Sequence, residues 1–90
     1  MQITDENHRS ALAQSGYENI KAAIIDLLRV TPNGLSNSEV AELLGLRTGL
    51  DGRQKDYLTW SILQDLVFRK VLRKIPKPNS KRHLLYQYCA

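Results

Sequence analysis

The spacing of apolar residues changes near Arg69, and this change limits the possible folds more than any other feature of the chain. Up to that point apolar residues recur every three or four positions, which is the period of an amphipathic helix. The segments "KVLRKI" and "HLLYQY" that follow are short and rich in β-forming residues, and "PKPNSKR" between them has turn composition. We therefore expect a helical body and an antiparallel hairpin that packs on it, because an isolated hairpin is only marginally stable.

The first expected helix ends near Val30, because the "TPNG" that follows combines a proline with an Asn-Gly turn signal. Its apolar residues at helical spacing are Tyr17, Ile20, Ala23, Ile24, Leu27 and Leu28. Gly16 is expected to break the pattern, so that residues 1–16 form either a flexible extension or a short helix of their own. The domain is then expected to span residues 17–90.

The second expected helix lies in "LSNSEVAELLGL" and has the clearest boundaries. Ser36 and Glu39, three residues apart, form a capping box at its start. Gly45 can adopt the left-handed conformation that commonly ends a helix, so the expected length is about ten residues. The stripe expected to face the core is made of Val40, Leu43 and Leu44, with Ala41 beside it. Residues 34–36 are candidates for a short third strand.

The third expected helix begins at residues 51–53 and runs to about Arg69, because Asp51 and Gln54 repeat the capping pattern. Its expected core stripe consists of Leu58, Ile62 and Leu66, flanked by Leu63. The opposite side carries Gln54, Tyr57, Ser61, Gln64 and Phe68. Trp60 lies at the shoulder between the two faces, and for a tryptophan there packing is favoured over exposure.

The order of helix, turn, helix, loop, longer helix and hairpin predicts an α+β, mainly α fold: a winged helix-turn-helix of three helices and a C-terminal β-hairpin. Ninety residues make one domain, and a hydrophobic content of 42% is enough for one core.

Several features of the sequence argue against particular functional classes. We expect no membrane span and no signal peptide, and the single cysteine, Cys89, favours a reduced, cytoplasmic setting. No Asp or Glu is followed two residues later by Lys, and no GxxxxGK motif is present. His8 and His83 are far apart in the sequence, and Ser61 has no adjacent base. We therefore expect no enzyme, metal, cofactor or small-molecule ligand.

The charges are distributed unevenly along the chain. Before Arg69 there are six basic and nine acidic residues, whereas from Arg69 onward there are seven basic residues and no acidic one. The net charge of +4 thus hides a mildly acidic body and a strongly basic C-terminal quarter. Such a patch attracts polyanions by screened Coulomb forces and counterion release, although a solvated basic hairpin that only aids solubility is the other interpretation.

The stretch "GLSNSEVAELLGL…GRQKDYLTWSILQDLV…KVLR" resembles the small winged-helix domains found alone or attached to type II restriction endonucleases. Those domains also combine a "GLSNxExAxxLGL" helix with a "GxQKxYLSWSxL" helix and a basic strand pair. The match covers residues 34–75. The resemblance implies binding of double-stranded DNA, with the third helix, residues 52–69, in the major groove and the basic wing, residues 76–83, on phosphates or in the minor groove.

The candidate DNA-binding residues follow from this arrangement. Recognition helices contact bases mainly through their N-terminal residues, and Gln suits adenine whereas Lys and Arg suit guanine. The candidates on the helix are Arg53, Gln54, Lys55, Tyr57 and Ser61. Those on the wing are Lys77, Asn79, Lys81 and Arg82, and Arg47 is a candidate phosphate clamp in the preceding loop.

Each candidate also has an interpretation without DNA. Gln54 can cap its own helix, the Lys55 stem can cover apolar surface, and Tyr57 can pack on the wing or on the first helix. The main functional alternative is a protein-interaction or dimerisation winged helix, in which an exposed aromatic patch of Tyr57, Trp60 and Phe68 docks a partner or a second copy. A homodimer is also compatible with DNA binding, because operator-binding proteins are commonly two-fold dimers. A transcription regulator and a restriction-associated reading module both remain open.

Overall fold

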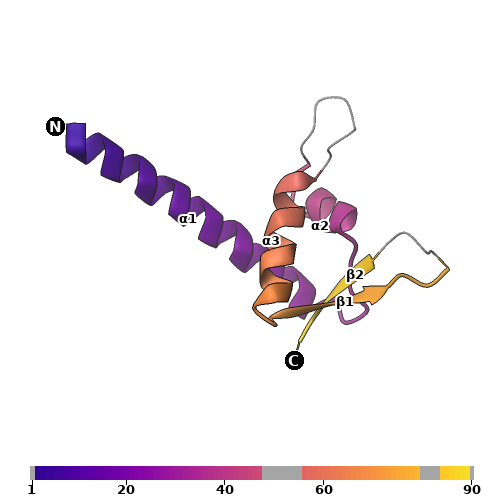
Figure 1. Ribbon diagram of the computed structural model, residues 1–90. Helices are drawn as coiled ribbons and strands as arrows, with labels where there is room; N and C mark the ends of the chain where they lie inside the picture. The colour runs from indigo at the N-terminus through magenta and orange to yellow at the C-terminus, as the bar shows by residue number, and fades with distance from the viewer. Residues whose placement is uncertain (1, 48–55, 80–83, 90) are drawn as a thin grey trace.

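The computed structural model describes residues 2–47, 56–79 and 84–89. Three helices are followed by one antiparallel hairpin: α1 (Gln2–Arg29), α2 (Asn37–Leu43), α3 (Tyr57–Phe68), β1 (Leu72–Pro76) and β2 (Leu84–Tyr88). Figure 1 shows α1 passing behind α3 toward the hairpin, with α2 beside α3 and the N-terminal part of α1 projecting away. The chain is therefore α+β and mainly helical, in an arrangement compatible with a winged helix.

Helix α1 is one continuous helix of 28 residues, so the break expected at Gly16 is wrong. A single glycine in a helix costs only about 1 kcal/mol relative to alanine, which is too little to end a helix by itself. Residues 6–19 are exposed, and Ile20 is the first side chain along the helix that is partly buried against the core. The division into residues 1–16 and 17–90 stays a prediction.

Helix α2 has the predicted capping residues, but it is shorter than predicted. The Ser36 hydroxyl accepts from the Glu39 N–H, the Glu39 side chain accepts from the Ser36 N–H, and Gly45 has a φ of +68°, as predicted. The helix has seven residues rather than about ten, because Leu44 is already its C-cap. Leu43 was expected in the core and is 62% exposed. The residues that α2 buries are Val40 and its neighbour Ala41.

Helix α3 begins at Tyr57, so the start expected at residues 51–53 is wrong. Asp56 is the N-cap and has a φ of 66°, a left-handed conformation that a right-handed helix cannot include. The expected cap residue Asp51 lies outside the described residues. The side chains that α3 buries are Thr59, Ile62, Leu63 and Leu66. Leu58 was expected with them but is 38% exposed, because a spacing of four drifts around the helix and leaves one end of the stripe at the edge.

The hairpin has the predicted antiparallel pairing, with Leu72 opposite Tyr88 and Pro76 opposite Leu84. Leu35 forms one isolated antiparallel bridge with Tyr86, so residues 34–36 meet the two-stranded sheet through a single residue and do not form the third strand for which they were candidates. The core that joins helices and hairpin consists of Ile24, Leu28, Val40, Ile62, Leu63, Leu66, Leu72 and Tyr86. Within the part of the chain that is described, none of the helices has the length and apolarity needed to cross a membrane.

A polar cluster joins the middle of α1 to the end of α3. The Tyr17 hydroxyl donates to Asp65 Oδ2 at 3.1 Å, and Arg69 Nε donates to the same oxygen at 2.9 Å. The hydrogen bond from Arg69 is the main reason why the pKa of Asp65 is lowered below its usual 3.8; desolvation opposes it, and the hydrogen bond from Tyr17 lowers the pKa further. The Asp65 carboxylate therefore accepts the hydrogen bonds from Tyr17 and Arg69 when it is charged.

We expect Asp65→Asn to lower stability at neutral pH and to have no such effect in strong acid. Because the folded pKa is lowered, the contribution of Asp65 is fully present above 3.8 and disappears as the pH falls through the folded pKa. Urea midpoints of both proteins, measured from neutral pH down to well below 3.8, check this. Asp26→Asn, an exposed substitution on α1, serves as the control; a difference for Asp65→Asn that persists unchanged in acid contradicts the prediction.

Candidate nucleic-acid interface

The solvent face of α3 carries Tyr57, Trp60, Ser61, Gln64 and Phe68, which share one side of the helix by their spacing. Trp60 is 43% exposed, so the prediction that this side chain is packed rather than exposed is wrong. Its ring lies against that of Tyr57, with centroids 5.4 Å apart and planes tilted by 52°. The two rings form an exposed aromatic pair at the start of α3, because Tyr57 itself is 60% exposed.

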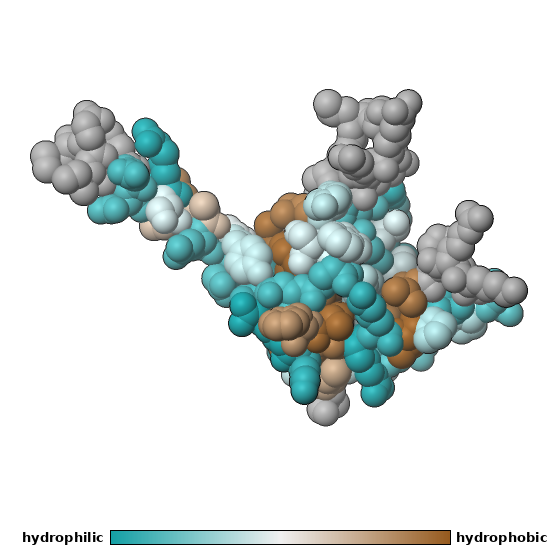
Figure 2. Space-filling view, in the orientation of Figure 1, coloured by the Kyte–Doolittle hydropathy of each residue, from teal (hydrophilic) through white to brown (hydrophobic). Residues whose placement is uncertain are grey.

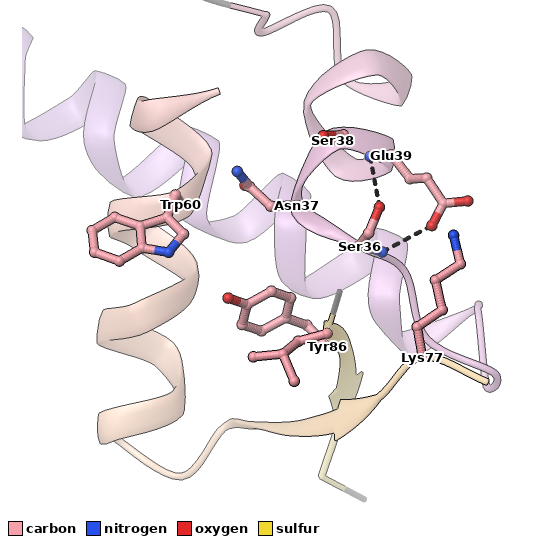
Figure 3. Close-up of a pocket in the computed structure, with 8 residues that line it drawn as sticks. Ser36, Asn37, Ser38, Glu39, Trp60, Lys77 and Tyr86 are labelled. Carbon is pink, nitrogen blue, oxygen red and sulfur yellow. Dashed lines mark hydrogen bonds between the residues drawn. The ribbon is translucent and has the colours of Figure 1, made fainter. Parts of the chain in front are cut away.

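A groove of about 440 Å³ separates this face from the hairpin. One wall comes from α3, the second from the start of α2 and the third from the hairpin (Figure 3). Its lining residues are Ser36, Asn37, Ser38, Glu39, Trp60, Lys77, Leu84 and Tyr86. The groove thus combines aromatic, hydroxyl, amide and charged groups from segments that are far apart in the sequence.

A hydrogen bond between Gln64 and Tyr86 connects α3 to the hairpin. Gln64 Nε2 donates to the Tyr86 hydroxyl at 2.6 Å, across from α3 to β2. Burial raises the pKa of Tyr86, and the hydrogen bond from Gln64 opposes that rise only in part, so the phenol stays neutral. This bond links the solvent face of α3 to the hairpin, in addition to the shared core.

Glu39 and Lys77 give the far end of the groove its charge. The Glu39 carboxylate accepts from the Ser36 backbone N–H at 2.9 Å, and this hydrogen bond is the main reason why its pKa is lowered. The positive charge of Lys77 lowers the pKa further, and Figure 3 shows the Lys77 amine directed toward that carboxylate. Lys77, predicted as a wing contact, therefore lies at the mouth of the groove and is exposed there.

Further basic side chains lie along β1. Arg73 and Lys74 are exposed on opposite faces of the strand, and Lys74 pairs with Tyr86, so that it shares the sheet face that turns toward α3. Arg73 Nε donates to Gln87 Oε1 at 3.0 Å on the other face. In Figure 2 the apolar surface of this side of the molecule appears as separate patches among hydrophilic side chains.

Arg47, the predicted phosphate clamp, is used within the protein. Its guanidinium lies 3.4 Å from Glu42 and 3.4 Å from Asp56, whose side chain is almost completely buried. A buried carboxylate needs a partner, and Arg47 supplies a positive charge to it. Phosphate binding by Arg47 stays a prediction, and it competes with this role.

The other predicted contacts fall into two groups. Ser61 is exposed, but its hydroxyl donates to the Leu58 carbonyl at 2.8 Å, and Asn79 occupies a turn with a φ of 64°. Five predicted contacts lie outside the described residues: Arg53, Gln54, Lys55, Lys81 and Arg82. Trp60 and Gln64 were not among the predicted contacts; their spacing of three and seven from Tyr57 places them on its face of α3, where Trp60 lines the groove and Gln64 bonds to Tyr86.

No group of three or more His, Cys, Asp or Glu side chains suited to a metal ion occurs in residues 2–47, 56–79 and 84–89. Comparisons of the chain with protein-family models, with curated proteins and with solved structures gave no match.

Proposed function

We propose that this chain is a winged-helix domain that binds double-stranded DNA, with α3 in the major groove and the basic wing, residues 76–83, on the phosphate backbone. The observation that carries the proposal is the groove between α3 and the hairpin, where the exposed residues of a short helix face a strand pair with exposed lysines. A transcription regulator or a restriction-associated reading module would use such a domain in the same way.

The shape and chemistry of α3 support this proposal. Its exposed face presents an indole, a phenol, a hydroxyl and an amide, which are groups that make apolar contacts and hydrogen bonds with base edges. Asp65, further along α3, is bound by Tyr17 and Arg69 and lies one to two turns from the aromatic pair. Close approach of DNA is therefore favoured at the start of α3, and its far end is less suited to it.

A titration of labelled duplex DNA with the purified protein tests the proposal directly. Measured by anisotropy at about 100 mM salt, binding is expected at micromolar protein concentrations or below, with affinity that falls as salt increases. An absence of duplex binding under these conditions would lead us to abandon the proposal.

We expect the double substitution Lys81→Ala and Arg82→Ala to weaken binding to all duplexes by a similar factor. Each phosphate contact releases about one counterion, so the slope of log affinity against log salt should become shallower by about two. Arg9→Ala with Lys21→Ala removes the same charge from α1 and is the matched control. An equal change of slope in both double variants would contradict a specific role of the wing.

A protein-interaction role is the second candidate, because three aromatic side chains of α3 are exposed. Phe68 is 84% exposed at the end of the helix, beyond Tyr57 and Trp60. In this role the aromatic patch docks a partner or a second copy of the chain, and the basic wing serves orientation. Sedimentation at two protein concentrations tests self-association, and a strict monomer that binds DNA favours the first candidate.

A further inference from the structure

A hydrogen-bond network at the carbonyl of Asp56 joins the starts of α2 and α3. Asn37 Nδ2 donates to this carbonyl at 3.0 Å, and Asn37 Oδ1 accepts from the Thr59 hydroxyl at 2.7 Å. The Thr59 hydroxyl also lies 3.0 Å from the Asp56 carbonyl. Both ends of the Asn37 amide are therefore used to hold the residue that precedes α3.

Thr59 and Asp56 lie in the interior, whereas Asn37 is partly buried at the wall of the groove. Thr59 is 0% exposed and Asp56 is 1% exposed, so a hydroxyl or carbonyl that loses its partner there stays unsatisfied. Asp56 also has a φ of 66°, a strained conformation that persists only where the surroundings hold it. The backbone turn into α3 thus depends on Asn37 and Thr59.

The same carbonyl starts the helix. The Trp60 N–H donates to the Asp56 carbonyl at 3.0 Å, as the first backbone hydrogen bond of α3. Any shift of that carbonyl moves the first turn, which carries the aromatic pair of Tyr57 and Trp60. Base recognition tolerates little displacement, because its hydrogen bonds and apolar contacts require side chains held within about 0.5 Å.

We propose that Asn37 and Thr59 are positioning residues that set the base preference of α3. Thr59 is buried and cannot touch DNA, so it acts through the orientation of Tyr57 and Trp60. The inference rests on the proposed DNA binding. In this proposal the hydrogen-bond network determines which DNA sequences are preferred. The basic wing provides the attraction to DNA of any sequence.

The test uses Thr59→Val, which keeps the shape of the side chain and removes the hydroxyl. The probes are a duplex enriched from a random pool by the wild-type protein and a scrambled duplex of equal length. The ratio of the two affinities is expected to fall about tenfold, whereas the affinity for the scrambled duplex and the salt slope stay unchanged. Thr59→Ser restores the hydroxyl and is expected to keep the ratio.

Two controls separate positioning from loss of structure. Thr31→Val removes another hydroxyl that bonds to a carbonyl, that of Leu27, at the end of α1, and the ratio should not change. If Thr59→Val does not fold, Thr59→Ala replaces it, and Thr31→Ala is its match. A Thr59→Val protein that folds and keeps the full affinity ratio overturns the proposal.

Hydrogen exchange at the Trp60 amide distinguishes failure of this inference from failure of DNA binding. Protection of that amide should fall in Thr59→Val and stay at the wild-type level in Thr31→Val, with or without DNA. If the wild-type protein binds no duplex, the proposed function fails and exchange alone decides whether the network positions α3. If it binds every duplex equally, the assignment of base preference is overturned.

Discussion

Leu63→Ala is expected to lower the free energy of unfolding by about 2–5 kcal/mol, which is the usual cost of a large cavity in a core. Leu63 is completely buried and belongs to the cluster that joins α1, α2, α3 and the hairpin. In a domain of this size such a loss is a large share of the total stability. Urea denaturation of the variant and the wild-type protein measures the difference.

Leu43→Ala is the matched control, because it removes the same atoms from a side chain that is 62% exposed. Its cost should stay within about 0.5 kcal/mol, as for other surface substitutions. Sequence spacing alone assigns both leucines to the core, so the two variants distinguish the observed packing from the expected one. Equal losses for both would mean that α2 buries Leu43 and that its observed orientation is wrong.

Gly34→Ala is expected to destabilise the protein by at least about 1–3 kcal/mol. Gly34 has a φ of +83°, and an added Cβ would lie 2.9 Å from the Tyr86 carbonyl oxygen and 2.9 Å from Gln87 Cγ. The first of these is backbone and cannot move aside without disturbing the Leu35–Tyr86 bridge. The substitution therefore acts on the contact that attaches the hairpin to the start of α2.

Gly16→Ala provides a control of the opposite sign. Gly16 lies within α1, and an added Cβ meets no atom within 4 Å, so alanine should stabilise the helix by about 0.5–1 kcal/mol. Thermal unfolding of both variants measures whether Gly34→Ala lowers the stability and Gly16→Ala raises it. A Gly34→Ala protein as stable as the wild type would be incompatible with the close approach of Tyr86.

Local signals made most of the secondary structure predictable. The capping box of Ser36 and Glu39 and the left-handed Gly45 depend on neighbouring residues alone, and the structure confirms them. The start of α3 was not predictable in this way. The capping signal of Asp51 is local, whereas the observed N-cap, Asp56, is held by Asn37 from another helix.

The candidate site was less predictable, because it depends on how distant segments meet. Trp60 is exposed in the wall of a groove whose other walls come from the start of α2 and from the hairpin. The pairing of Arg47 with the buried side chain of Asp56 joins two residues that no local sequence signal connects. Charge and spacing indicated the kinds of residue at the interface, and only the packing of the helices on the hairpin decides which of them are free to meet a ligand.

The chain contains a single tryptophan, and it lies in the wall of the groove. Indole emission responds to the polarity of its surroundings, so all tryptophan emission from this protein originates at the interface. Any molecule that fills the groove must shield or contact this ring, whereas one that binds only to the projecting part of α1 leaves it unchanged. The protein thus has an intrinsic optical probe that reports where a ligand binds, without a label.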